Sequence, residues 1–219
     1  PDLISPEKML LAYATAAAAG AMTVKFAADT LRERGLVSLL ARTVLATGAV
    51  FCFFEVFPHY AVGVSEVHLI LGSTLLLIFG AAPAAIGLAL GLLIQGLFFA
   101  PFDLPQYFAN VTTLIAPLVA IKFLADRIIP ANTPYVDLRY GQALALSATY
   151  QGGVVLWVAF WALYGQGFGA ENLTDIVTFG GAYMLVVLLE PLVDLAVLAG
   201  AKLARGLART GLVTPRLFA

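Results

Sequence analysis

Charged residues are scarce in this sequence. Only 11% of its 219 residues are Asp, Glu, Lys or Arg, whereas an ordinary soluble domain has about 25%. Hydrophobic residues make up 61%, and the few charges are grouped so that long runs carry none. A soluble chain of this size has too little interior for so many apolar side chains, so lipid must surround most of its surface. No basic patch is present, which excludes a nucleic-acid-binding protein.

Residues that carry chemistry are equally few. The single cysteine, Cys52, excludes an internal disulfide and is expected to be a small buried apolar side chain. Neither of the two histidines belongs to an HExxH motif, and GxSxG and GxxxxGK[ST] motifs are absent. We therefore expect that the protein is not an enzyme and that it carries no organic cofactor.

The long apolar runs predict an all-α fold. We expect a polytopic membrane bundle of about seven transmembrane or half-spanning helices that forms a single domain over residues 1–219. The expected helices cover residues 9–28, 36–54, 67–79, 84–100, 107–124, 143–164 and 176–201. The third is about 20 Å long, too short for a hydrocarbon core of about 30 Å. We therefore expect it to be packed inside the bundle, with a break at residues 80–83.

The basic residues predict an orientation in the membrane. If the N-terminus is outside, eleven of the twelve Lys and Arg residues lie on the inner side, and only Lys8 lies on the outer side. The expected outer loops, residues 55–66, 100–106 and 165–175, contain no Lys or Arg. Because cytoplasmic loops are enriched in basic residues, we expect the N-terminus outside and the C-terminus in the cytoplasm.

Both histidines then lie at the outer face. His68 would begin the short third helix, and His59 would lie in the preceding loop. Glu66 comes two residues before His68, so on a helix the two side chains would point to different sides. Neutral imidazole is a ligand for nickel, cobalt, copper and zinc. Two histidines do not complete a metal site, and a capping or packing role for each is the alternative.

Two acids share one face of the expected last helix, because Glu190 and Asp194 are one turn apart. Glu190 lies about 21 Å from the outer end, and an acid at that depth is a functional candidate. We expect a structural or coupling role for Glu190, bonded to a polar group such as Gln142 or Gln151. Asp194 is expected to be solvated near the inner surface.

Other residues in the apolar runs indicate a compact bundle. The amides of Gln95 and Asn110 are expected to hydrogen-bond across helices. Gly87 and Gly91 are four residues apart, which lets two helix backbones approach closely.

Several short motifs also form a set along the chain. They are Ser65, His68 and Leu69; Phe79 and Gly80; Gln95 with residues 97–100; Ala109, Asn110 and Val111; and Glu190 in the last helix. Together they resemble the substrate-specific membrane component of the cobalt/nickel energy-coupling-factor (ECF) ABC transporters, the CbiM/NikM-like family. Residues 12–21 are similar to the first helix of that family, and the similarity is best over residues 64–120.

The resemblance implies a substrate-binding (S) component that imports Ni²⁺ or Co²⁺ across the inner membrane of a prokaryotic cell. It implies seven helical segments with the N-terminus outside and a divalent metal bound near the outer surface. A coupling transmembrane subunit and two ATPase subunits would be its partners.

The resemblance also implies a set of metal ligands. These are nitrogens of the terminal amine, of the second residue's backbone amide and imidazole, and of a histidine at the position of His68. His59 and Glu66 are the other candidate ligands in this sequence, with Ser65, Gln95 and Asn110 as supporting polar residues.

Two departures from the family pattern leave an alternative open. The family opens with Met-His and this sequence opens at Pro1, so either a Met-His dipeptide precedes Pro1 or half of the metal site is lost. A His-Gly-Gly-like loop of the family is replaced here by Pro101, Phe102 and Asp103. The alternative is a non-transporting accessory or scaffolding subunit of a larger membrane complex, with a degraded metal site. The sequence does not choose between nickel and cobalt.

Overall fold

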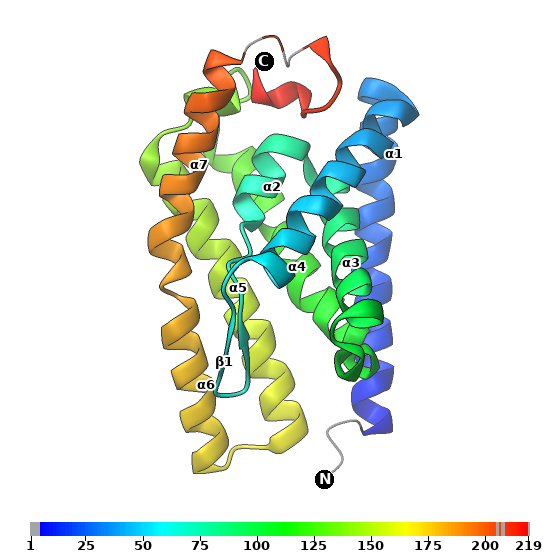
Figure 1. Ribbon diagram of the computed structural model, residues 1–219, viewed down its shortest axis with the longest axis vertical. Coiled ribbons are helices and arrows are strands. Elements are labelled where there is room, and N and C mark those ends of the chain that lie inside the picture. The colour runs from blue at the N-terminus through cyan, green and yellow to red at the C-terminus, as the bar shows by residue number, and fades with distance from the viewer. Residues whose placement is uncertain (1–4, 205, 207–208, 219) are drawn as a thin grey trace.

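The computed structural model describes residues 5–204, 206 and 209–218, which form an elongated helical bundle (Figure 1). The helices are α1 (Pro6–Phe51), α2 (Gly72–Phe79), α3 (Ala81–Phe98), α4 (Tyr107–Ile128), α5 (Tyr140–Gln166), α6 (Ala170–Tyr183) and α7 (Val186–Leu203). A π-helical turn follows α1 at Cys52–Val56, and 3-10 turns lie at Pro101–Gln106, Tyr135–Asp137 and Pro215–Leu217. The first turn of α1 and the 3-10 turn at Pro215–Leu217 lie at opposite ends of the bundle.

Five helical segments are long and apolar enough to cross a membrane: Pro6–Val56, Ala81–Phe98, Pro101–Ile128, Tyr140–Gln166 and Ala170–Leu203. The first of them reverses at Gly35, whose backbone is not helical (φ 76°, ψ 178°), and its two arms run along the bundle in opposite directions. This agrees with the expected break between the first two helices. Large apolar side chains such as Val37, Leu156 and Val177 are exposed on the outside, as contact with lipid requires.

A β-hairpin makes the chain nearly, but not entirely, α-helical. Strand β1 (Tyr60–Val62) pairs antiparallel with β2 (Ser65–Val67), with Tyr60 opposite Val67 and Val62 opposite Ser65. The expectation of a helix from residue 67 is therefore wrong. Because residues 65–67 give their backbone hydrogen bonds to β1, the short helix begins only at Gly72.

The last expected helix, residues 176–201, lies within the single apolar span Ala170–Leu203, which consists of two helices. Helices α6 and α7 divide at Met184 and Leu185, where the backbone forms short-range bonds that do not continue the α-helical pattern, such as Val187 N–H to Met184 O (3.1 Å).

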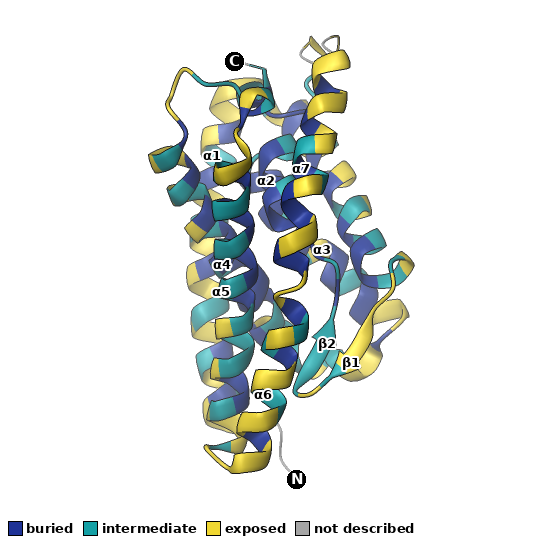
Figure 2. Cartoon of the chain, turned by 90° about the vertical axis from the view of Figure 1, so that its left-hand side faces the viewer, coloured by how far each residue is buried: buried dark blue, intermediate teal, exposed yellow. Residues whose placement is uncertain are grey.

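Helix α2 lies inside the bundle, as its length predicted. Most of its residues are buried (Figure 2). It ends at Gly80, whose φ of 87° and ψ of 169° belong to a region that glycine adopts far more easily than other residues. This position confirms the expected break before α3.

Close helix packing depends on two further glycines of α3. A Cβ at Gly87 would lie 2.7 Å from the Cβ of Ala46, and one at Gly91 would lie 2.4 Å from Cγ1 of Val50. The second arm of α1 therefore approaches the backbone of α3 directly, as the spacing of the two glycines indicated.

We expect Gly72→Ala to destabilise the protein by about 1–3 kcal/mol, because a Cβ at Gly72 would lie 2.3–2.5 Å from ring carbons of Tyr150 in α5. Thermal unfolding in detergent measures the change. Gly152→Ala is the matched control, since nothing lies within 4 Å of a Cβ there, and it should leave stability unchanged or slightly raised. Equal unfolding temperatures for the two variants would contradict this packing.

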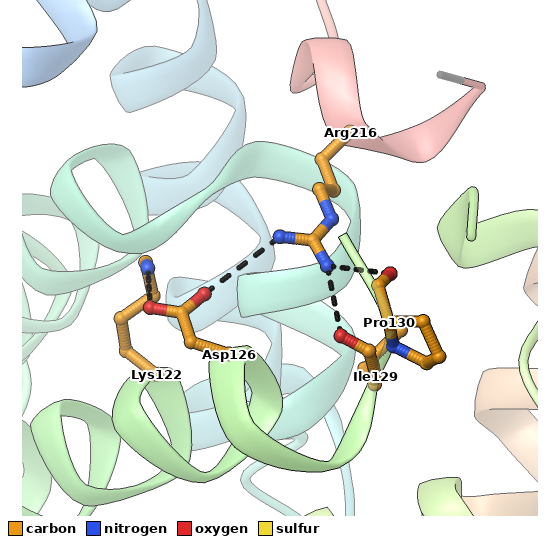
Figure 3. Close-up of polar contacts among 5 residues, drawn as sticks. All are labelled: Lys122, Asp126, Ile129, Pro130 and Arg216. Carbon is orange, nitrogen blue, oxygen red and sulfur yellow. Dashed lines mark hydrogen bonds and ion pairs between the residues drawn. The ribbon is translucent and has the colours of Figure 1, made fainter. Parts of the chain in front are cut away.

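The segment after α7 is fastened to the end of α4 (Figure 3). Arg216 Nη2 donates to the carbonyl oxygens of Ile129 and Pro130, both at 3.2 Å. Its Nη1 lies 3.8 Å from Asp126, which also pairs with Lys122. These contacts hold the C-terminal turn across one end of the bundle.

Candidate functional site

Five of the candidate site residues line one cavity of about 350 Å³. Ser65 and Glu66 come from β2, His68 from the segment after it, Gln95 from α3 and Asn110 from α4. The hairpin places this cavity in the half of the bundle that holds the N-terminus. Asp103, in the turn between α3 and α4, lines the same cavity and was not identified as a site residue from the sequence.

His68 is held in an extended segment and not on a helix. Successive side chains of an extended chain point to opposite sides, so residues two apart point to the same side. Oε2 of Glu66 accordingly lies 3.2 Å from Nε2 of His68. The helix-based expectation that these side chains diverge is wrong for this reason. Only 7% of His68 is exposed.

The environment of His68 keeps its imidazole neutral. Burial away from water, with a second contribution from His59, lowers the pKa of His68 to about 4. At neutral pH Nε2 therefore lies beside the carboxylate of Glu66 as part of an uncharged ring. A proton on Nε2 would face that carboxylate, and Nδ1 would then carry the lone pair. Nδ1 is buried and has no hydrogen-bond partner among the described residues. A neutral imidazole oriented by a carboxylate in this way is suited to bind a metal ion.

His59 does not line the cavity. Its ring stacks on that of His68, with centroids 5.1 Å apart and planes at 23°, and its Nδ1 lies 3.2 Å from the carbonyl oxygen of Phe57. The ring is exposed. The structure thus brings His59 beside His68 but outside the cavity.

The cavity favours a cation. Glu66 and Asp103 both line it and repel each other electrostatically, and no Lys or Arg of the described residues is in its lining. The amides of Gln95 and Asn110 also face it. The expected hydrogen bonds from these amides to other helices are not found within the described part of the chain.

Side chains of the described residues supply an incomplete ligand set. Within residues 5–204, 206 and 209–218, no three His, Cys, Asp or Glu side chains lie close enough together to hold a metal ion. The neighbouring cavity, of about 270 Å³, is lined by Lys8 of α1 and shares Ser65, Asn110 and Thr113 with the first. The first turn of α1 therefore lies next to the cavity that contains His68.

A buried network of hydrogen bonds holds the first turn of α2. The backbone N–H of Ser73 donates to Glu190 Oε1 (2.9 Å), and Ser147 Oγ donates to Glu190 Oε2 (2.6 Å). The hydroxyls of Ser73 and Thr74 donate to the two oxygens of Asp194, at 2.7 and 2.5 Å. Asp194 is only 1% exposed, so the expectation that it is solvated is wrong, because α7 packs its inner face against α2.

The same network reaches the segment that carries His68. Gln151 Nε2 donates both to Glu190 Oε2 (2.8 Å) and to the carbonyl oxygen of Ile70 (2.7 Å), two residues after His68. The expected bond between Glu190 and Gln151 is therefore present. Gln142 bonds instead to the carbonyl of Ile128, at 2.9 Å. Through Gln151, helix α7 is connected to the backbone beside the cavity.

Comparison with known protein families identifies a match over most of the chain. The sequence model of the family described as cobalt uptake substrate-specific transmembrane region matches residues 1–205. No curated protein and no solved structure matches the chain.

Proposed function

The chain belongs to the cobalt uptake substrate-specific transmembrane family, and from that premise we propose that it is the S component of an ECF-type importer that captures Co²⁺ or Ni²⁺ at the outer face of the membrane. The observation that carries the proposal is Nδ1 of His68, a buried nitrogen with no hydrogen-bond partner among the described residues. His68 lines a cavity together with two carboxylates and with no basic side chain of the described chain.

His68 would bind the ion directly. Nitrogen ligands suit Co²⁺ and Ni²⁺. A hydrogen bond from Nε2–H to Glu66, whose carboxylate lies 3.2 Å away, would orient the ring and raise the basicity of Nδ1. The two carboxylates would attract the ion electrostatically, and the amides of Gln95 and Asn110 would hold water or the ion's outer shell.

The remaining ligands would come from the segment that leads into α1. The first turn of α1 lies beside the cavity, as the position of Lys8 in the neighbouring cavity supports. A terminal amine and a backbone amide would add nitrogen donors without requiring further histidines in the bundle, which fits a chain with only two.

Transport would require other subunits. A divalent ion cannot enter hydrocarbon unaided, so the bound ion would have to be released by movement of the whole component. We propose a coupling transmembrane subunit and two ATPase subunits as the partners that drive this movement, docked at the basic end of the bundle, which would face the cytoplasm of a prokaryotic cell.

Titration calorimetry tests the function. The protein expressed from its complete gene and purified in detergent should bind one Co²⁺ or one Ni²⁺ per chain, and Mg²⁺ at the same concentration should give no heat, because Mg²⁺ prefers oxygen ligands. The ion that binds more tightly identifies the substrate. Binding of neither Co²⁺ nor Ni²⁺ would contradict the proposal and support the alternative of an accessory or scaffolding subunit.

A further inference from the structure

A larger cavity, the basic cavity, lies at the opposite end of the bundle, beside the turn of α1 and the C-terminal segment. Its volume is about 890 Å³. Six basic residues line it: Lys25, Arg32, Arg34, Arg42, Lys122 and Arg216. Three acidic residues line it as well: Asp29, Glu33 and Asp126. The lining therefore has an excess of three positive charges.

Two of the three acids of this lining, Asp126 and Asp29, pair with cations other than Arg42. Asp126 lies between Lys122 and Arg216 (Figure 3), and Asp29 lies 3.8 Å from Arg32. No ion pair within 4.0 Å joins Arg42 to an acid in the described part of the chain. The third acid, Glu33, attracts Arg42 electrostatically but makes no ion pair with it, so Arg42 has no counter-ion in direct contact.

Arg42 is also the most deeply buried of these cations, with 1% exposed. Nη1 donates to the carbonyl oxygen of Phe79 (2.7 Å), and Nε donates to Ser38 Oγ (3.2 Å). These bonds explain how Arg42 holds the end of α2. Nη2 takes part in none of these bonds. It is buried and has no hydrogen-bond partner among the described residues. A buried guanidinium without a counter-ion is unfavourable unless an anion completes its bonds.

Two further features of the lining favour an anion beside Arg42. Helix α3, 18 residues long, begins at Ala81 with no side-chain cap. Gly80 and Ala81 line this cavity, so the positive dipole end of α3 lies beside it. Thr214 adds a hydroxyl. A Cβ at Gly80 would lie 3.2 Å from Arg42 Nη1 and 3.4 Å from Thr214 Oγ1, so both side chains lie against the same glycine.

We propose that the basic cavity binds a phosphate-bearing anion, with Nη2 of Arg42 as a direct donor and the N-terminus of α3 and Thr214 as neighbouring donors. A phosphate group has several oxygens in a compact tetrahedron, which matches a guanidinium and backbone N–H groups that approach from different elements. A lipid headgroup of the leaflet at this end or a soluble phosphate compound can present that group. The site is separate from the cavity of His68.

Native mass spectrometry and thermal unfolding of the full chain in detergent test this site. The protein is mixed with phosphatidylglycerol or phosphatidylcholine for the first measurement, and with sodium phosphate or sodium chloride at constant ionic strength for the second. We expect preferential retention of phosphatidylglycerol, a higher unfolding temperature in phosphate, or both. Retention of phosphatidylglycerol without a higher unfolding temperature in phosphate identifies a lipid as the ligand. A higher unfolding temperature in phosphate without retention of phosphatidylglycerol identifies a soluble phosphate compound.

Three variants assign the effect to the site. Arg42→Gln should weaken phosphate or phosphatidylglycerol binding about tenfold. Thr214→Val leaves the bonds of Arg42 to α2 intact and should weaken binding about threefold. This variant therefore tests the anion site even if Arg42→Gln does not fold. Arg127→Gln is the control, because it removes an exposed positive charge of α4 that is not in the lining, and it should change nothing.

The proposal is overturned if the wild-type protein distinguishes neither phosphatidylglycerol from phosphatidylcholine nor phosphate from chloride. It is also overturned if Arg127→Gln weakens binding as much as Arg42→Gln and Thr214→Val. Stabilisation only by a co-purified protein subunit would likewise overturn it, because Arg42 would then pair with a carboxylate of that subunit.

Discussion

Replacing His68 with alanine should weaken the binding of Co²⁺ by more than about 100-fold. The imidazole is the one neutral nitrogen ligand that a described side chain presents to the cavity, and its unpartnered Nδ1 has no substitute once the ring is removed. Competition titration against a coloured chelator measures the change over the required range. Circular dichroism of the variant shows whether the helical fold is retained.

His59→Ala is the matched control for this result. It removes the other imidazole, which is exposed and stacks on His68 from outside the cavity. We expect less than a threefold change, roughly the size of a lost packing contact. If His59→Ala weakens binding as much as His68→Ala, the two rings act together and the assignment of His68 as the single side-chain nitrogen ligand is wrong.

The second large effect is expected at Glu190. This side chain is fully buried and accepts hydrogen bonds from Ser73, Ser147 and Gln151. In Glu190→Gln an NH₂ group replaces one acceptor oxygen, so at least one buried donor loses its partner and faces another donor. We expect a loss of about 3 kcal/mol in the free energy of unfolding. Chemical unfolding in mixed micelles, followed by circular dichroism, measures this loss.

Glu171→Gln makes the same chemical change at an exposed position of α6 and should alter stability by less than about 0.5 kcal/mol.

Gln151→Leu adds a test of the connection to the cavity, because it removes the donor to the carbonyl of Ile70. We expect it to weaken Co²⁺ binding about tenfold even where the variant stays folded. Unchanged affinity in folded Gln151→Leu would show that the network stabilises the bundle without positioning His68.

The sequence predicted the features that depend on length and periodicity. Residues 67–79 are too few to cross a bilayer, and α2 is indeed inside the bundle. The spacing of Gly87 and Gly91 indicated close packing against another helix, which is observed at Ala46 and Val50. The depth of Glu190 implied polar partners, and Gln151 is one of them.

Features that depend on contacts between distant segments were not predictable in this way. A three-residue strand, Ser65–Val67, is too short for its alternation to be distinguished from the start of an apolar helix, so the orientation of Glu66 toward His68 was missed. Asp194 was expected near water because the position of α2 against α7 cannot be read from either helix alone. Asp103 was seen only as a departure from a family motif, and its place in the cavity depends on the turn between α3 and α4.

The most direct test of the account is the position of the metal itself. A crystal of the protein expressed from its complete gene and loaded with Co²⁺, measured at the cobalt absorption edge, should give one strong anomalous peak in the cavity between β2, α3 and α4. The peak should lie about 2.0–2.2 Å from a ring nitrogen of His68, the usual length for a metal–imidazole bond. A peak between Glu190 and Asp194, or no peak near His68, would contradict the proposed capture site.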